Sequence, residues 1–446
     1  MGMQGHSRIT RRSFLKRAAG VGAAAAFPTI VPSSVFGQNA PSNRLGIGHI
    51  GMGLMMGSHL NKMVRADDAQ VVAVCDVDRG RLEKAKATVE NGYAKRSPSG
   101  TFKGCGAHHE FEELLARDDV DVVFVATPDH WHAPISVMAM RHGKDVYVQK
   151  PMTLTIKEGR IMSDTARQYG RILQVGSQQR SERAFRRAVQ IVRNGLIGKV
   201  HTIYTSLGEF PPPQTLPEEA IPDGFDYDRW LGPTPWYPYN AKRVKGDYGG
   251  GWRCFWDYGA RKNGDWGAHH FDIIQWALGM DDSGPVEFIP KGYEGTEYQT
   301  HIYADGTKVL RNHPVKNGQM IQFIGEKGEV LVSRGDRLET TPAELKDTDL
   351  GPEKETLSDV PPGYKGVWVY VSNAHEENFI ECVKTRKQPI CPAEIGHRTA
   401  TVCHLNGIAE RLKRPLKWDP VKEEIVGDAE ASRWMDRARR APYIYI

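Results

Sequence analysis

Lys150 lies at a position where the sequence predicts chemistry. A continuous apolar run at 122–126 ends at Thr127, and after a helical pattern a second apolar run at 146–148 leads directly into Lys150. This order predicts two buried parallel strands joined by a helix. Ligands of open parallel sheets lie beyond the carboxyl ends of the strands, so residues 127–132 and Lys150 are expected to face a ligand crevice.

Glycines after the first predicted strand indicate a dinucleotide-binding turn. Two registers of the fingerprint compete, one at 46–51 and one that begins at Gly51. The first leaves almost no strand before its first glycine, whereas the second follows a complete strand and precedes a helix, as the motif requires. We therefore assign Gly51, Met52 and Gly53 to the turn that approaches a pyrophosphate. The third glycine is then replaced by Met56 or displaced to Gly57.

Asp76 follows the second predicted strand, at 70–75, and comes 25 residues after Gly51. An acidic residue at this place accepts hydrogen bonds from the adenosine ribose and repels a 2′-phosphate, which favours NAD over NADP. Arg79 and Arg81 are close enough in sequence to weaken that preference, so NADP remains an alternative. A role for Asp76 as the N-cap of the next helix, at 79–89, is compatible with ribose binding.

A second group of reactive side chains opens a predicted helix that runs to residue 278. Asp265 and His269 are four residues apart, so in a continuous helix they share one face. Before this helix lies a long aromatic and proline-rich segment, 210–258, of a kind that is usually functional rather than a mere connection. Its tryptophans, which include Trp252, could stack on sugar faces or pin an irregular segment by burial.

These motifs resemble a known family. Thr127-Pro128 with His130 and His132, then Gly143-Lys144, then Gln149-Lys150-Pro151, is similar to the glucose-fructose oxidoreductase, inositol dehydrogenase and rhizopine catabolism family of NAD(P)-dependent sugar oxidoreductases. The resemblance covers nearly the whole chain after its N-terminal leader. It implies a nicotinamide cofactor in the first domain and a sugar, glycoside or polyol in the cleft between two domains.

The resemblance also implies catalytic roles. Lys150 corresponds to the family's catalytic lysine, and Asp265 and His269 to its Asp-x-x-x-His pair, with His270 pointing elsewhere. A neutral imidazole suits the removal of a hydroxyl proton, and Asp265 would orient it or bind a neighbouring hydroxyl. Lys150 would stabilise negative charge on the reacting oxygen.

The predicted site residues fall into three groups. The catalytic candidates are Lys150, His269 and Asp265. The cofactor-binding candidates are Gly51, Met52, Gly53, Asp76, Thr127, Pro128, His130, His132, Gln149 and Lys150. The substrate-binding candidates are Lys150, Arg180, Trp252, Asp265 and His269, and no metal ligand is predicted.

Gln149 departs from the family pattern, which usually has Glu-Lys-Pro. A glutamate would help to keep Lys150 charged, whereas a neutral amide removes that support, so Lys150 should lose its proton more readily. On this reasoning Gln149→Glu is expected to shift the alkaline limb of the pH–rate profile upward.

Two domains are predicted to position these residues. Residues 44–176 are expected to form an α/β Rossmann domain with a doubly wound parallel sheet that binds NAD(P). Residues 177–446 are expected to form an α+β domain with a largely antiparallel open sheet, which binds substrate, supports oligomers and ends in an arginine-rich tail. The alternating segments at 199–207, 286–289, 297–303, 319–325 and 328–332 are its predicted strands.

The leader, residues 1–40, resembles a twin-arginine export signal. Arg11-Arg12 precedes an alanine- and glycine-rich run that is too short and too rich in glycine for a good transmembrane helix. Export predicts a periplasmic protein that contacts no membrane once the signal is removed. Separately, we expect a homo-oligomer, dimer or tetramer. Free NAD is scarce outside the cytoplasm, so the cofactor is expected to be loaded before export and held tightly.

Charge and cysteines exclude other classes. The chain has 59 basic and 54 acidic residues, and five of the basic ones lie in the leader, so the rest is balanced and no nucleic-acid partner is expected. The six cysteines lack metal-finger spacing. A Cys382–Cys391 disulfide is compatible with an oxidising compartment but is not established by the sequence.

Three other functions remain open. Transient oxidation of a sugar ring would let the chain act as an NAD-dependent glycoside hydrolase or lyase, although the tyrosine motif associated with exported N-acetylgalactosaminidases is not evident. A non-catalytic sugar sensor would be consistent with Gln149 and Met56. A metal-dependent hydrolase would need a set of metal ligands. The candidate sets are the His-His-Glu run at 108–110, the pair His130 and His132, and the group His269, His270 and Asp272, and none has recognised ligand spacing.

Overall fold

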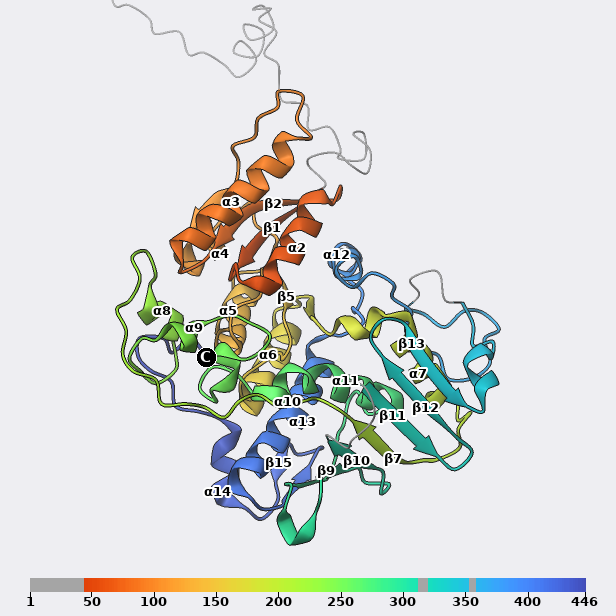
Figure 1. The fold of residues 1–446 in the computed structure, drawn as a ribbon. Helices are drawn as coiled ribbons and strands as arrows, with labels where there is room; N and C mark the ends of the chain where they lie inside the picture. Colours follow the sequence, from red (N-terminus) through yellow and green to blue (C-terminus); the bar gives the residue numbers. More distant parts are fainter. Residues whose placement is uncertain (1–43, 312–319, 353–357) are drawn as a thin grey trace, which may run out of the picture. The chain divides into compact units, whose positions relative to one another are not determined.

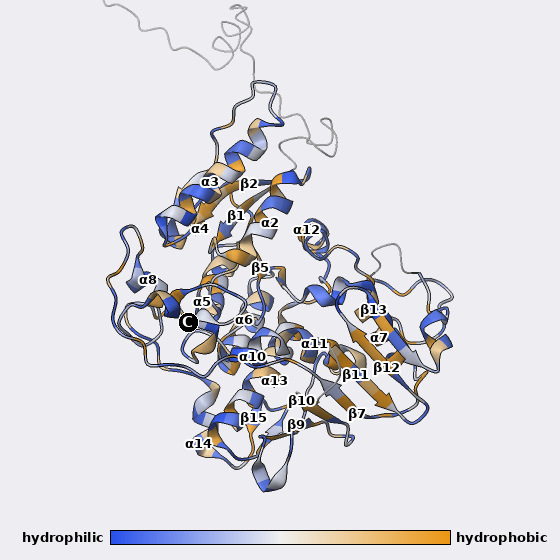
Figure 2. Cartoon of the chain, viewed as in Figure 1, coloured by the Kyte–Doolittle hydropathy of each residue, from blue (hydrophilic) through white to orange (hydrophobic). Residues whose placement is uncertain are grey.

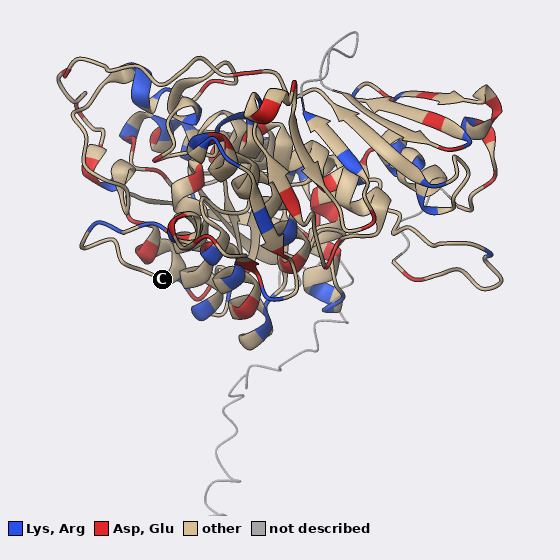
Figure 3. Cartoon of the chain, turned by 90° about the horizontal axis from the view of Figure 1, so that it is seen from below, with Lys and Arg blue, Asp and Glu red and all other residues tan. Residues whose placement is uncertain are grey.

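The computed structural model describes residues 44–311, 320–352 and 358–446. The predicted signal peptide therefore lies outside the described residues. Residues Leu45–Ile446 form one unit. Within the described part of the chain, no helix is both long and apolar enough to cross a membrane. In Figure 3, basic residues in blue and acidic residues in red are interspersed along the elements, in agreement with the balanced charge.

The first sheet has six parallel strands in the order β3-β2-β1-β4-β5-β6 (Figure 1). They are β1 (Leu45–Ile50), β2 (Ala69–Cys75), β3 (Gly106–His108), β4 (Val122–Val125), β5 (Asp145–Val148) and β6 (Leu173–Val175). The central strands β4 and β5 are buried along their whole length, as their apolar composition predicts. The strand order reverses between β1 and β4, and a doubly wound sheet binds its ligand at such a reversal.

Five helices connect these strands. They are α2 (Leu54–Arg65), α3 (Arg79–Ala94), α4 (Phe111–Leu115), α5 (Asp129–Arg141) and α6 (Ile156–Gln168). Helix α5 begins directly after Pro128, and α6 begins at a capping box formed by Thr155 and Glu158. Helix α3 runs five residues further than the predicted end at residue 89, so the loop predicted after it is shorter.

The second sheet has nine strands in the order β13-β12-β11-β7-β10-β9-β8-β14-β15. Only the β7–β10 pair is parallel, so the prediction of a largely antiparallel sheet is confirmed. The strands are β7 (Val200–Thr205), β8 (Glu287–Ile289), β9 (Gln299–Ile302), β10 (Lys308–Arg311), β11 (Met320–Gly325), β12 (Gly328–Ser333), β13 (Arg337–Thr341), β14 (Leu416–Asp419) and β15 (Glu424–Ile425). The sequence analysis missed β10, β13, β14 and β15.

Helices cover this sheet and bury its apolar residues, which Figure 2 shows as orange strands. The longer ones are α7 (Arg183–Arg193), α11 (Gly267–Leu278) and α13 (Ala393–Leu412). Helix α12 (His375–Thr385) packs instead on the first sheet, where Phe379 contacts Phe124 and Tyr147. Short turns complete the domain: η3 (Gln178–Ser181), η5 (Tyr293–Gly295), η6 (Ala343–Asp347), α14 (Ala429–Ser432) and η7 (Arg433–Met435).

The aromatic segment before α11 folds back on the first domain. It contains α8 (Tyr227–Leu231), α9 (Ala241–Val244) and η4 (Gly251–Cys254), and α10 (Arg261–Asp265) follows it. Backbone hydrogen bonds join it to the chain after β2: the amide of Arg79 donates to the carbonyl of Gly224, and the amide of Asp226 donates to the carbonyl of Val77. Trp230 and Trp252 are buried, whereas Trp236 is 59% exposed. Burial is thus the better account of the first two.

The C-terminal tail packs on its own chain and clamps this segment. The guanidinium of Arg440 lies 2.6 Å from the Asp228 carboxylate, to which the Tyr443 hydroxyl also donates a hydrogen bond. The Tyr445 hydroxyl donates to Glu112 in α4. The tail therefore joins α8 to the Rossmann domain.

All six cysteines are buried and free, so the Cys382–Cys391 disulfide is not formed. Among the described residues, no cluster of three or more His, Cys, Asp or Glu side chains is arranged to hold a metal ion.

Arg180 lies in a buried ion-pair network rather than at a substrate site. Its side chain is 1% exposed, and its guanidinium nitrogens lie 2.7 Å from Asp272 and 2.6 Å from Asp281. It also stacks over Trp276. The expectation that Arg180 binds substrate does not agree with this position.

Asp272→Ala should destabilise the protein, because it removes the buried partner of a buried guanidinium. We expect a loss on the order of 3 kcal/mol in the free energy of unfolding, measured by urea denaturation followed through tryptophan fluorescence. Asp336→Ala is the control, because its ion pair with Arg183 is more than half exposed and should contribute less than about 1 kcal/mol. Equal losses in the two variants would contradict a structural role for the Arg180 network.

Candidate active site

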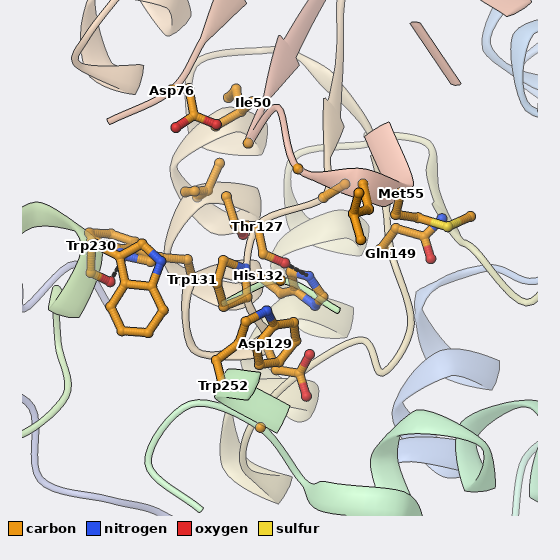
Figure 4. Close-up of a pocket in the computed structure, with 18 of the residues that line it drawn as sticks. Ile50, Met55, Asp76, Thr127, Asp129, Trp131, His132, Gln149, Trp230 and Trp252 are labelled. Atoms are coloured by element: carbon orange, nitrogen blue, oxygen red, sulfur yellow. Dashed lines mark hydrogen bonds between the residues drawn. The ribbon is translucent and has the colours of Figure 1, made fainter. Parts of the chain in front are cut away.

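A cavity opens at the carboxyl ends of the first-domain strands, beneath the aromatic segment. The space between the lining atoms is about 1260 Å³ when the space open to solvent is included. Residues from both domains line it, among them Gly51 and Lys150, and Figure 4 labels Asp76, Thr127 and Trp252 around it.

The glycine turn forms one wall of the cavity. Gly51 has a φ of +85°, and a Cβ atom there would lie 2.7 Å from Cγ2 of Thr127, so only glycine fits. Gly53 is the N-cap of α2, makes no side-chain cap, and has open space where a Cβ would point. The first amides of α2 are thus left for an anion, and this turn fits the pyrophosphate of a dinucleotide.

The fingerprint register that begins at Gly51 agrees with the structure, because residues 46 and 48 lie inside β1. The missing third glycine has a packing explanation. Met56 is fully buried in the core beneath α2, whereas a Cβ at Gly57 would meet nothing within 4 Å. Helix α2 therefore rests on the sheet through a methionine, without the close approach that a glycine permits.

Asp76 lines the cavity at the end of β2. Its carboxylate accepts hydrogen bonds from the amide of Met52 at 2.6 Å and from the amide of Asp78 at 2.8 Å. Burial raises the pKa of Asp76, and these bonds together with Arg81 oppose that effect. The N-cap of α3 is Asp78 rather than Asp76. Met52 itself does not line the cavity. Arg81 does line it, and its guanidinium provides a cation beside Asp76.

The two histidines of the Thr-Pro motif are held by backbone carbonyls. His132 lines the cavity, and its ring nitrogens lie 2.7 Å from the carbonyl of Pro151 and 2.9 Å from that of Thr127. His130 lies outside the cavity and bonds the carbonyl of Trp230 at 2.8 Å. Burial lowers the pKa of both to about 4. His130 thus fastens the aromatic segment to α5 and is placed away from a cofactor in the cavity.

Lys150 and Asp265 meet in the cavity, as the sequence analysis expected. The ammonium of Lys150 lies 3.1 Å from the Asp265 carboxylate and 2.8 Å from its backbone carbonyl. Arg253 and Lys262 lie 3.6 and 3.7 Å from the same carboxylate. Burial alone would raise the pKa of Asp265, but these three cations lower it below its usual value. Asp265 is therefore a stable anion surrounded by cations.

Gln149 does not face the ammonium of Lys150. The side-chain amide nitrogen of Gln149 lies 2.7 Å from one ring nitrogen of His59, and the other ring nitrogen of His59 lies 2.9 Å from Glu376. The side-chain oxygen of Gln149 accepts a 3.3 Å hydrogen bond from the backbone amide of Lys150. A glutamate at this position would act first on His59. The expected effect of Gln149→Glu on the lysine charge is therefore not supported by this geometry.

His269 is held against Arg334. Helix α10 ends at Asp265 and α11 begins at Gly267, and Trp266 between them keeps helical backbone angles. The imidazole of His269 lies 3.0 Å from the guanidinium of Arg334 and is not among the residues that line the cavity, while its Nδ1 has no hydrogen-bond partner among the described residues. Burial, with Lys150 and Arg334 nearby, holds its pKa well below the usual value. The role of His269 as the base stays a prediction.

The sequence analysis missed several lining residues. Arg253 stacks 4.3 Å over Trp252 and approaches Asp265, and Asp129 contributes a buried carboxylate. Arg229 and Tyr248 reach the cavity from the aromatic segment. Asp129 could have been found, because it stands in the strand-end loop that was expected to face a ligand. The others could not, because no local pattern shows that a segment 100 residues away covers the cleft.

Comparisons with known proteins agree with this architecture. The family model described as "Oxidoreductase family, NAD-binding Rossmann fold" matches residues 45–177, and "Oxidoreductase family, C-terminal alpha/beta domain" matches residues 209–445. Among solved structures, the WlbA dehydrogenase from Bordetella pertussis in complex with NADH and UDP-GlcNAcA has a TM-score of 0.58 at 16% identity, covering 84% of this chain and 99% of that one. The aldose-aldose oxidoreductase from Caulobacter crescentus complexed with glycerol has a TM-score of 0.55 at 18% identity, with the same coverage. At these identities the likeness shows the fold alone.

Curated relatives match over a shorter stretch. The "Glycosyl hydrolase family 109 protein 2" of Shewanella sp. (strain ANA-3) is 34% identical over 174 residues, which are 36% of this chain and 37% of that protein. The "Glycosyl hydrolase family 109 protein" of Shewanella sp. (strain W3-18-1) is 28% identical over 207 residues, 43% and 44% of the two chains. The chain thus spans less than half of the length of these relatives. The C-terminal family model alone matches more than half of the chain, and the N-terminal model matches the domain that carries the glycine turn. The chain therefore belongs to the oxidoreductase family of glucose-fructose oxidoreductase, inositol dehydrogenase and the rhizopine catabolism proteins.

Proposed function

We propose that this protein transfers a hydride between a secondary hydroxyl of a sugar, glycoside or polyol and a tightly held NAD, with NADP as the alternative cofactor. One observation carries the proposal: the uncapped glycine turn and the Lys150–Asp265 pair line the same cavity. The turn supplies a dinucleotide site, and the pair supplies a cation for a reacting oxygen at the other end.

Each group in the cavity has a distinct task. The amides at the start of α2 bind the pyrophosphate, and Asp76 accepts hydrogen bonds from the ribose after its carboxylate leaves Met52. The ammonium of Lys150 donates to the substrate oxygen and stabilises its developing negative charge. Asp265 fixes that ammonium and can bind a neighbouring hydroxyl. When bound, the oxidised nicotinamide supplies the hydride acceptor.

Tight binding of the cofactor is supported by the cover over the cavity. His109 of the first domain lies 3.0 Å from Asp226, and Arg229 bonds Glu112 at 3.0 Å, so α8 is tied to the Rossmann domain beside the cavity. A cofactor beneath such a cover leaves only when these contacts open. This arrangement suits the proposed export of a loaded protein to the periplasm, where free NAD is scarce.

The names of the curated relatives favour a second candidate. Both are described as glycosyl hydrolase family 109 proteins. In the corresponding scheme a sugar ring is oxidised transiently, and the ketone acidifies the adjacent C–H. Loss of that proton and of the glycosidic oxygen leaves a double bond, water adds to it, and the hydride returns to the ketone. The cofactor would be regenerated in each cycle, so this candidate gives released aglycone without net oxidation.

Purified protein should carry nicotinamide cofactor and respond to sugars. We expect the near-ultraviolet absorbance of reduced nicotinamide to rise when a free hexose, an N-acetylhexosamine or myo-inositol reacts, because no second acceptor is present to remove the hydride. Heat release and chromatography would identify NAD or NADP. Aglycone released from a nitrophenyl glycoside without net reduction would favour the hydrolase. Protein that carries and binds no dinucleotide would contradict both candidates.

Lys150→Ala should abolish turnover and leave the fold intact. We expect the rate of cofactor reduction to fall ~10²-fold or more, since the cation at the reacting oxygen is lost. Lys157→Ala in α6 is the matched control, because Lys157 is exposed and lies away from the cavity. If both variants keep the wild-type rate and sugar affinity, the chain is a sensor rather than an oxidoreductase.

A further inference from the structure

The reacting end of the cavity carries more positive than negative charge. Three cations surround the carboxylate of Asp265: Lys150 at 3.1 Å, Arg253 at 3.6 Å and Lys262 at 3.7 Å. In the part of the chain that the structure describes, they form no other ion pair, so three cations against one carboxylate leave an excess of two positive charges. Their side chains are only 10 to 17% exposed, so salt and water screen this excess weakly.

The excess charge acts on the cations themselves. Burial lowers the pKa of Lys262, Asp265 opposes this effect, and the nearby charges of Lys150 and Arg253 lower the pKa further. The ammonium of Lys262 lies 4.0 Å from the ring centre of Phe210, which compensates for part of the repulsion. Lys150 and Arg253 line the cavity. Partly buried cations that lack a partner are costly, and a negatively charged ligand in the cavity would neutralise them.

Arg253 is held in place but has a donor left for a ligand. Its guanidinium carbon lies 4.3 Å from the ring centre of Trp252 and 5.5 Å from that of Tyr248. Nη1 donates a 2.9 Å hydrogen bond to the carbonyl of Asp247, and Nη2 donates to no partner among the described residues. A guanidinium that is stacked on rings and free at one edge is suited to bind a carboxylate or a phosphate.

One further carboxylate faces this end of the cavity. Asp129, at the start of α5, is buried, and a Cβ atom at Gly259 would meet both its carboxylate and the ring of Trp252. Figure 4 shows Asp129 beside Trp252. Burial raises the pKa of Asp129 to about 7, against the weaker effects of Arg253 and Lys150. This carboxyl group can therefore take up a proton near neutral pH, and in that form it does not repel an anionic ligand.

We propose that the substrate is an acidic sugar, which carries a carboxylate or a phosphate group and binds Arg253 through it; this inference rests on the proposed oxidoreductase function. The acidic group accepts a hydrogen bond from Nη2 of Arg253 and neutralises part of the excess positive charge. Lys150 donates at the same time to the hydroxyl oxygen that is oxidised. Arg253 thus selects the substrate and takes no part in the transfer of the proton or the hydride.

The alternative is that Arg253 binds the pyrophosphate of the cofactor. Tyr248, on which Arg253 stacks, has its hydroxyl 3.8 Å from the sulfur of Met55 in α2, close to the glycine turn. Two observations favour the substrate instead. Arg253 lies within 3.6 Å of Asp265, and it is the cation that most strongly lowers the pKa of Asp129. A cofactor role would change the affinity for the nucleotide, whereas a substrate role changes the preference between sugars.

The decisive measurement compares sugars that differ only in the acidic group. Single-turnover reduction of the cofactor gives second-order rate constants for glucose, glucuronate and glucose 6-phosphate, and for galactose and galacturonate. Wild type should prefer an acidic sugar to the neutral hexose of the same configuration by about 10-fold to 100-fold, because a hydrogen bond between charged groups is gained. The uronate and the 6-phosphate distinguish a carboxylate from a phosphate. Equal rate constants for acidic and neutral sugars would overturn the proposal.

Variants of Arg253 test the assignment to this residue. Arg253→Met should remove the preference for the acidic sugar, and Arg253→Lys, which keeps the charge without the planar fork, should retain part of it. Arg243→Met is the matched control, because Arg243 lies in the same segment and also stacks on two rings but does not line the cavity. A preference that survives Arg253→Met, or a loss of nucleotide affinity with the preference unchanged, would contradict the role of Arg253.

A titration without turnover separates this inference from the proposed function. With reduced nicotinamide bound, a sugar hydroxyl cannot be oxidised, so calorimetry measures binding alone. Glucuronate or glucose 6-phosphate should bind more tightly than glucose, and added salt should weaken only the acidic ligand. Wild type that binds the acidic sugar in this way but reduces its cofactor with no sugar would contradict the oxidoreductase function and support the acid site. Wild type that oxidises neutral sugars and shows no salt-sensitive binding would overturn the acid site alone.

Discussion

The ion pair between Lys150 and Asp265 is the contact on which the site depends. Lys150 ends a strand of the parallel sheet, and Asp265 ends a short helix that leads into the main helix over the second sheet. Because the ammonium binds both the carboxylate and the carbonyl of one residue, it fixes the end of α10 against β5. The pair costs desolvation, which Arg253 and Lys262 offset by adding two more cations around the same anion. The geometry of the reacting centre is therefore set by electrostatics between domains.

On one side of this pair the cavity is built by the parallel sheet of the Rossmann domain. On the other side it is covered by the aromatic segment. The reversal of strand order at β1 and β4 supplies the crevice, and Gly51 supplies the only backbone conformation that fits beside Thr127. The cover comes from the aromatic segment, whose rings pack on one another and on His130. Trp252 belongs to this cluster and to the cavity wall at once. The packing of the aromatic segment therefore also shapes the wall of the cavity.

The parts of this picture that depend on local sequence could be predicted. Apolar runs, the glycine turn and the residues after each parallel strand identified the Rossmann domain, Asp76 and Lys150 correctly as cavity residues. The sequence also placed Asp265 beside Lys150, through the resemblance. It failed for Arg180, whose position is decided by its distant partners Asp272 and Asp281. No local pattern shows that Arg334 lies against His269.

The tail that clamps α8 has a consequence for how the aromatic segment can move. Arg440 and Tyr443 hold Asp228 in α8, and Tyr445 holds Glu112 in α4. Any movement of α8 away from the first domain must therefore also break the contacts of the tail. The aromatic segment and the tail are accordingly expected to open together, as one cooperative unit.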